Sequence, residues 1–228
     1  MERKICHIMV LDKFIPPYIN FIEKYFDINN HHFIIFADSN TLKTYPIAKS
    51  ANITFINQEY HSRLSKLFYI AYRLQSARKI FIHGLWIHHI NIILTFMFWN
   101  LKKCHLAIWG GDLYCYQFDK KTKEYFKKEK YRRFVFKNIG YIIPVVYGDY
   151  DLAKIWYHTK AKCLEPFMYV QFYEKYVSMP LKLQGNIVNI QVGNSATDTN
   201  HHIDCFDILV NFENINIYAP LSYGDKKY

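Results

Sequence analysis

Short apolar runs and stretches of helical periodicity alternate along almost the whole chain. Continuous apolar runs between polar segments are typical of strands that are buried on both faces of a parallel sheet. We predict such strands at residues 6–11, 32–36, 53–56, 79–83, 105–109 and 141–146. Helical spacing of apolar residues lies between them, at residues 16–26, 64–74, 85–101, 120–138 and 149–158. This alternation predicts a doubly wound, Rossmann-like α/β domain over residues 1–180.

A shorter version of the same pattern follows over residues 184–228. It predicts a strand at 187–192, a helix at 200–210 and a strand at 215–219. The apolar positions of that helix are expected to face inward; they are Ile203, Phe206, Leu209 and Val210. A single βαβ unit leaves much of its sheet uncovered, so we interpret 184–228 as the start of a second, incomplete Rossmann-like domain.

Composition supports a folded protein with an anionic partner. Hydrophobic residues make up 51% of the 228 residues and charged residues 21%, which excludes a disordered chain. The segment Ile80–Trp99 has the length of a membrane span, but it contains His83, His88, His89 and Asn91. Such residues are costly in hydrocarbon, so a strand and a helix are the better interpretation.

The net charge of +10 favours nucleic acid, acidic phospholipid or a diphosphate substrate as partner. Nine cations lie close together on the predicted helix 120–138: Lys120, Lys121, Lys123, Lys127, Lys128, Lys130, Arg132, Arg133 and Lys137. This helix either rests on anionic lipid, or approaches a diphosphate, or is an ordinary solvated helix. No nucleic-acid-binding motif accompanies the charge, so we expect no nucleic-acid partner.

Metal and disulfide chemistry have little support. The five cysteines are scattered without a CxxC pair, which indicates reduced thiols. His83, His88 and His89 have no accompanying carboxylate, so we predict no metal site, and a structural role is the alternative for His88 and His89.

The segment Gly193–Asp198 (GNSATD) follows the predicted strand 187–192 and precedes a predicted helix. A glycine allows a tight turn there, and the small polar side chains that follow suit a phosphate on backbone N–H groups. Thr199 or Asn200 is expected to cap the helix. The alternative is an ordinary βα loop, because the segment is neither a GxGxxG nor a Walker motif.

Two further motifs end predicted strands, where open α/β sheets bind ligands. Asp112, in Trp109–Tyr114 (WGGDLY), is a candidate base or sugar-hydroxyl ligand, or it caps the following helix. His83, followed by Gly84, is a candidate proton acceptor near neutral pH.

Taken in order, these motifs resemble those of the 4-acetamido-4,6-dideoxygalactose (Fuc4NAc) transferases of enterobacterial common antigen synthesis. The matching segments are residues 82–84 (IHG), 107–114 (AIWGGDLY), 147–149 (YGD), 191–195 (QVGNS), 200–203 (NHHI) and 219–224 (APLSYG). Together they cover nearly all of the chain, and WGGDLY with VGNS is the specific combination.

The resemblance implies a GT-B arrangement of two facing Rossmann-like domains, the first for the acceptor and the second for the nucleotide sugar. It implies a dTDP-sugar donor, a polyprenyl-diphosphate-linked saccharide acceptor and no cofactor. It also implies a peripheral protein on the cytoplasmic face of the bacterial inner membrane, where the basic helix would meet anionic lipid.

Roles for individual residues follow from this resemblance and from the strand-end positions. Asp112 and His83 are expected to be catalytic. The expected donor or phosphate site consists of Gly193, Asn194, Ser195, Thr197 and Tyr223. The expected acceptor side consists of Gly84, Trp109, Gly110, Gly111 and Tyr114.

Family members continue well past the position of Tyr228, so we expect a second domain that is cut short. Two outcomes remain open at this point. The chain either transfers sugar or has lost this activity through the truncation. The alternative function is a non-catalytic, basic module that binds a membrane surface or a partner protein.

Overall fold

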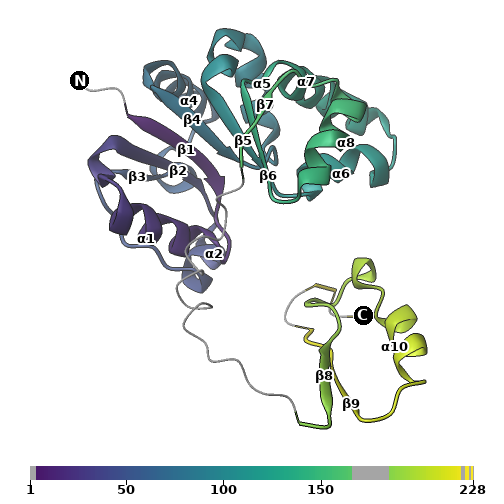
Figure 1. Cartoon of the computed structure of the whole chain (residues 1–228). Coiled ribbons are helices and arrows are strands. Elements are labelled where there is room, and N and C mark those ends of the chain that lie inside the picture. The colour runs from purple at the N-terminus through teal and green to yellow at the C-terminus, as the bar shows by residue number, and fades with distance from the viewer. Residues whose placement is uncertain (1–3, 166–184, 222–223, 226, 228) are drawn as a thin grey trace. The chain divides into compact units, whose positions relative to one another are not determined.

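The computed structural model of the chain (Figure 1) describes residues 4–165, 185–221, 224–225 and 227. The chain divides into two compact units, Met1–Glu174 and Lys175–Tyr228. The predicted domain boundary between 180 and 184 falls outside the described residues and stays a prediction. Each unit is described by itself.

The first unit is built on a seven-stranded sheet in the order β3-β2-β1-β4-β5-β6-β7. All of its strand pairs are parallel. The strands are β1 (Ile5–Val10), β2 (His31–Phe36), β3 (Ile53–Phe55), β4 (Lys79–His83), β5 (Cys104–Ile108), β6 (Tyr141–Pro144) and β7 (Lys162–Cys163). The predicted Rossmann-like α/β fold is therefore confirmed.

Helices cover both faces of this sheet (Figure 1). They are α1 (Ile15–Tyr25), α2 (Ser39–Thr44), α3 (Ile56–Glu59), α4 (Arg63–Ser76), α5 (His88–Phe96), α6 (Gly111–Phe118), α7 (Lys123–Asn138) and α8 (Tyr147–Tyr157), with 3-10 turns η1 (Ile28–Asn30) and η2 (Phe98–Lys103). Because strand side chains alternate, Met9 of β1 packs with α1 while Ile8 packs in the cluster of α4, α5 and α7. The core therefore has two layers, one on each side of the sheet.

The strand order fixes where a ligand is expected. The chain runs from β1 outward to β3, then crosses to β4 on the other side of β1. The crevice outside the carboxyl ends of β1 and β4 is thus the topological switch point, where open α/β sheets bind ligands.

The helix predicted at 85–101 is shorter than expected. Helix α5 begins only at His88, and its C-cap Met97 leaves the helical region before η2 begins. The backbone N–H of Leu85 donates to a distant side chain, Asp112, so this segment forms a loop rather than the first helical turn. Among the described residues, no helix combines the length and apolarity that a bilayer span requires.

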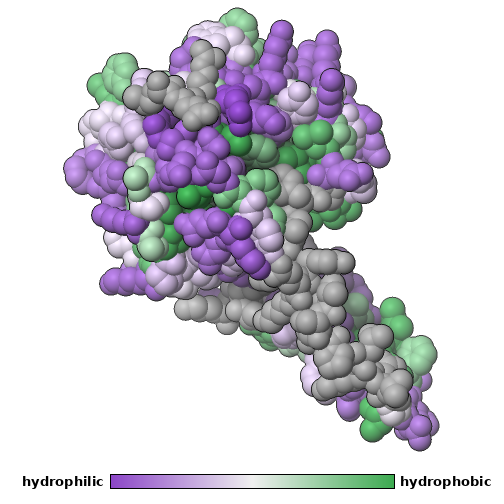
Figure 2. Space-filling model, turned by 60° about the vertical axis from the view of Figure 1, so that its left-hand side comes forward, coloured by the Kyte–Doolittle hydropathy of each residue, from purple (hydrophilic) through white to green (hydrophobic). Residues whose placement is uncertain are grey.

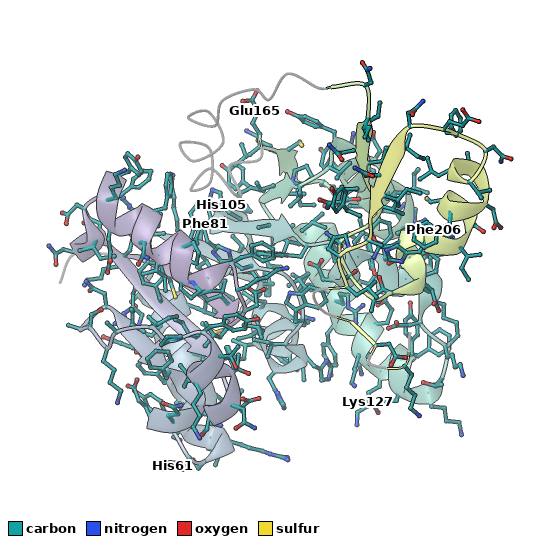
Figure 3. All side chains as sticks on the ribbon, turned by 90° about the horizontal axis from the view of Figure 1, so that it is seen from below. His61, Phe81, His105, Lys127, Glu165 and Phe206 are labelled. Atoms are coloured by element: carbon teal, nitrogen blue, oxygen red, sulfur yellow. The ribbon has the colours of Figure 1, made fainter. Side chains whose placement is uncertain are left out.

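One row of rings crosses the first sheet from strand to strand. His7, Phe81, His105 and Tyr141 stand opposite one another on β1, β4, β5 and β6. Their ring centroids are 4.4–5.3 Å apart along the row. Figure 3 labels Phe81 and His105 in this row. The row places polar imidazoles inside the sheet core, where they must be neutral or paired.

The second unit contains the βαβ pattern that the sequence predicts. Strands β8 (Val188–Gln191) and β9 (Ile215–Tyr218) are parallel, with η4 (Asp198–Asn200) and α10 (His202–Leu209) between them. The inward orientation predicted for the helix is wrong for three positions, since Ile203, Phe206 and Val210 are 74%, 37% and 78% exposed. A two-stranded ribbon is too narrow to cover the apolar side of this helix.

Candidate active site

A pocket of about 210 Å³ lies at the topological switch point of the first unit. It is lined by Val10, Asp12, Ile15, His83, Trp86 and Trp109. These residues come from the carboxyl ends of β1 and β4, the loops after β1, β4 and β5, and the first residue of α1. Two predicted residues, His83 and Trp109, are thus brought together, and sequence reasoning missed Asp12 and Trp86.

The loop after β4 is shaped by glycine. Gly84 has a φ of +81°, a conformation that L side chains rarely adopt. A Cβ on Gly84 would also overlap the indole of Trp86, and one on Gly111 would lie 2.7 Å from Cη2 of the same ring. The Trp86 indole therefore rests on the bare backbone of two glycines. It is 49% exposed, so the pocket has an aromatic wall.

Asp112 joins the two loops that carry the indoles. Its Oδ2 accepts the Leu85 N–H at 3.0 Å, and its Oδ1 accepts the Trp109 N–H at 3.0 Å. The residue is 2% exposed, and this burial raises its pKa to about 6 despite the backbone donors. The capping alternative is wrong, because the N-cap of α6 is Gly110 and has no side-chain hydrogen bond. The observed geometry is that of a positioning residue.

We expect Asp112→Ala to destabilise the first unit by about 2–4 kcal/mol, because two buried N–H groups lose their acceptor. Asp112→Asn is expected to cost less, because an amide oxygen still accepts one of the two N–H groups. Denaturant unfolding of both variants measures this order. Equal stability of wild type and Asp112→Ala would contradict the assigned role.

His83 belongs to a chain of three buried imidazoles. Its Nε2 lies 3.4 Å from Nδ1 of His7, whose Nε2 lies 2.9 Å from Nδ1 of His31. Nδ1 of His83 is buried and has no hydrogen-bond partner in the described part of the chain. Burial lowers the pKa of His83 to about 3, so the ring is neutral at physiological pH. It is therefore a weak base by itself but a good hydrogen-bond partner for a ligand.

Asp12 is the carboxylate of the pocket. It lies two residues after the end of β1, and its Oδ1 accepts the Phe14 N–H at 2.8 Å at the entry to α1. Burial is the main influence on its pKa and raises it above the usual value, against the backbone N–H groups that lower it. The sequence signal for Asp12 was its position immediately after the first apolar run.

The other predicted acceptor-side residues have structural contacts. Gly110 has a φ of +92° at the start of α6. Tyr114 donates its hydroxyl hydrogen bond to Oδ1 of Asp149 at 2.7 Å, and this bond is the main cause that raises the Tyr114 pKa to about 12. Tyr114 thus ties α6 to α8 through the Tyr147–Asp149 motif.

The predicted phosphate loop of the second unit is braced by its own side chains. Asn200 Nδ2 donates to Ser195 O at 2.8 Å, Ser195 Oγ at 2.7 Å and Thr197 Oγ1 at 3.0 Å. A Cβ on Gly193 would lie 2.5 Å from Nε2 of His202, so glycine is needed there for packing as well as for its φ of +65°. Asn194 is exposed on this loop.

The predicted helix cap is wrong, because α10 begins at His202 and its N-cap His201 has no side-chain cap bond. Asn200 braces the loop instead. Tyr223 lies outside the described residues. The donor role of this loop stays a prediction. In the described ranges, no three His, Cys, Asp or Glu residues are grouped to hold a metal ion.

Comparison with known proteins identifies the family. The model of glycosyl transferase group 56, described as 4-alpha-L-fucosyltransferase, matches residues 13–228. No curated protein sequence matches the chain. The match spans the pocket loops after β4 and β5 and the Gly193 loop of the second unit, and it confirms the resemblance drawn from the motifs. The chain belongs to glycosyl transferase group 56 and is a glycosyltransferase with a Rossmann-like α/β fold.

Proposed function

We propose that this glycosyltransferase moves an acetamido-dideoxyhexose of the Fuc4NAc type from a dTDP-sugar to a polyprenyl-diphosphate-linked saccharide in bacterial surface polysaccharide synthesis. It works as a peripheral protein on the cytoplasmic face of the inner membrane. The first unit receives the acceptor and the second unit the nucleotide sugar, as in a GT-B enzyme. The motifs after β4, β5 and β8 support this assignment.

The observation that carries the proposal is the switch-point pocket. It combines one carboxylate, one histidine and two indoles around a single hollow. Nδ1 of that histidine is buried and has no hydrogen-bond partner among the described residues. Indole faces suit the apolar face of a sugar ring, and the polar groups suit its hydroxyls. This combination suits the binding and deprotonation of an acceptor sugar.

In the proposed step, the acceptor hydroxyl loses its proton to Asp12 as its oxygen forms a bond to the anomeric carbon of the donor. The bond from that carbon to the diphosphate breaks, and dTDP leaves with the electron pair. Asp12 is a better base than His83, because burial raises the carboxylate pKa and lowers that of the imidazole. Nδ1 of His83 hydrogen-bonds the acceptor, and Asp112 holds both indole-bearing loops.

A transfer assay with two donors tests the function. Purified full chain is incubated with a lipid-linked acceptor and either radiolabelled dTDP-Fuc4NAc or a radiolabelled L-fucose nucleotide. We expect label to enter the lipid fraction with the dTDP donor. Transfer from the fucose donor alone would refute the proposed sugar. No transfer from either donor, with vesicle binding retained, would favour the non-catalytic membrane module.

A further inference from the structure

Helix α4 presents an apolar stripe to solvent. Leu64, Phe68 and Tyr72 are spaced four residues apart, so they share one side of the helix. They are 66%, 74% and 57% exposed. The opposite side of α4 carries Ile70 and Leu74, which are buried in the core. Helix α4 therefore packs on the core through the side opposite to the exposed stripe.

Further exposed rings lie at the end of α5 and the start of η2. Phe96, Phe98 and Trp99 are 68%, 59% and 53% exposed. This segment is fixed to the end of α4, because Trp99 Nε1 donates to Gln75 Oε1 at 2.8 Å. We call the six residues the aromatic surface: Leu64, Phe68, Tyr72, Phe96, Phe98 and Trp99.

The charged residues of the stretch that carries the aromatic surface all have one sign. No acidic residue occurs between Glu59 and Asp112, whereas this stretch contains Arg63, Lys66, Arg73, Arg78, Lys79, Lys102 and Lys103. Helix α7 packs against both α5 and η2 and adds further cations beside them. Lys123, Lys127, Lys130 and Lys137 of α7 are exposed, and Lys127 is labelled in Figure 3.

Acidic residues of α7 do not neutralise this surface. Glu129 is 5% exposed and lies between Arg132 and Arg133, 3.6 Å from a guanidinium nitrogen of each. Glu124 pairs with Lys128 at 3.3 Å. Among the described residues, no ion pair is formed by Lys123, Lys127, Lys130 or Lys137, so these lysines present positive charge next to α5 and η2.

We propose that the aromatic surface, flanked by the α7 lysines, is the face that docks on an anionic phospholipid bilayer. The rings enter the interfacial layer and the ammonium groups contact lipid phosphates. A protein partner would need acidic groups over the same broad area, whereas an anionic bilayer offers them everywhere. The proposal rests on the peripheral placement in the proposed function and adds an apolar contact, made by α4, α5 and η2, to the basic helix α7.

Apolar residues also reach other parts of the molecular surface, as Figure 2 shows in green on the face that it presents. Exposure alone therefore does not single out a docking face. The combination of in-line rings, predominantly basic charge and a fixed junction between α4 and η2 does so.

Vesicle co-sedimentation, without donor or acceptor, tests the surface separately from sugar transfer. We expect the full chain to bind phosphatidylcholine vesicles that contain phosphatidylglycerol. The variant Leu64→Ser/Phe68→Ser/Phe98→Ser should bind at least about tenfold more weakly. The variant Lys127→Glu/Lys130→Glu should bind the same vesicles at least about tenfold more weakly than wild type. Unchanged thermal unfolding checks that each variant is folded.

The matched control is Ile203→Ser/Val210→Ser/Phe212→Ser, which removes three side chains of similar exposure (74%, 78% and 60%) from the second unit. It should bind like wild type. Fluorescence quenching by brominated lipids should fall in Trp99→Phe. Equal losses in the control and the α4/η2 variant, or no vesicle binding by wild type, would overturn the proposal.

Discussion

Asp12→Asn is expected to lower kcat for sugar transfer by about 10²–10⁴-fold, the usual contribution of a general base. An amide can still accept the Phe14 N–H that Asp12 Oδ1 accepts in wild type, so the entry to α1 should keep its shape. The amide cannot take the proton of the acceptor hydroxyl. The loss should therefore be in kcat, with a small change in the acceptor KM.

The control for this prediction is Asp38→Asn. Asp38 caps α2 by accepting the Thr41 N–H at 2.7 Å, and asparagine is an equally good N-cap. Transfer assays should show unchanged kcat for the control. If Asp12→Asn kept kcat within about twofold of wild type, Asp12 would not be the group that takes the proton, and the assigned base would be wrong.

The second large effect is acid lability of the first unit. Burial lowers the pKa of His83 and His32 to about 3 and that of His7 well below its usual value. These rings stay neutral when folded and take up protons on unfolding below about pH 6.5. Their contribution to stability is present above that pH and is lost as the pH falls.

Buried carboxylates work in the opposite direction. Burial raises the Asp112 pKa to about 6, so unfolding releases its proton between about pH 4 and 6. Burial also raises the Asp12 pKa, which acts in the same direction. On unfolding in acid, the first unit then takes up a net number of protons on the order of one to two. This corresponds to a loss of about 1.5–3 kcal/mol of unfolding free energy per pH unit on acidification.

Urea unfolding measured from pH 7 to pH 4.5 should show this slope. His83→Gln should reduce the slope of unfolding free energy against pH by the equivalent of up to about one proton. His61→Gln, at an exposed histidine, is the control and should leave this slope unchanged. A slope that is flat in wild type, or equal in wild type and His83→Gln, would show that these imidazoles are not kept neutral by burial.

The sequence predicts the sheet well because parallel strands buried on both faces leave continuous apolar runs. Residues 79–83 match β4 at both ends, and each long apolar run of the first unit forms a strand. The two-residue strand β7 and the short helices α2 and α3 escaped prediction, since so few residues carry no readable period.

The pocket was predictable only in part. His83 and Trp109 could be placed because they end apolar runs, and strand ends of one sheet edge meet in space. The role of Asp112 could not be predicted, because the Leu85 N–H that it accepts is distant in sequence. Trp86 was missed because its indole packs against Gly84 and Gly111, which are far apart in the sequence.

In the Gly193 loop, residue types suggested a ligand site where the side chains instead bond to one another. Its composition suggested polar groups open to a phosphate, yet Asn200 Nδ2 bonds both Ser195 and Thr197 within the loop. Small polar residues satisfy loop backbone as readily as they bind ligands, so their types alone do not separate the two uses.

In the proposed reaction, the acceptor binds in the pocket against His83. Long-range ¹H–¹⁵N spectra of the histidine rings, recorded while a short-chain polyprenyl diphosphate saccharide is added, test it most directly, with His83→Gln to assign the signal. We expect the His83 Nδ1 signal to shift on binding and that of His105, further along the sheet, to stay in place. Acceptor binding detected by calorimetry with no change at His83 would contradict the account.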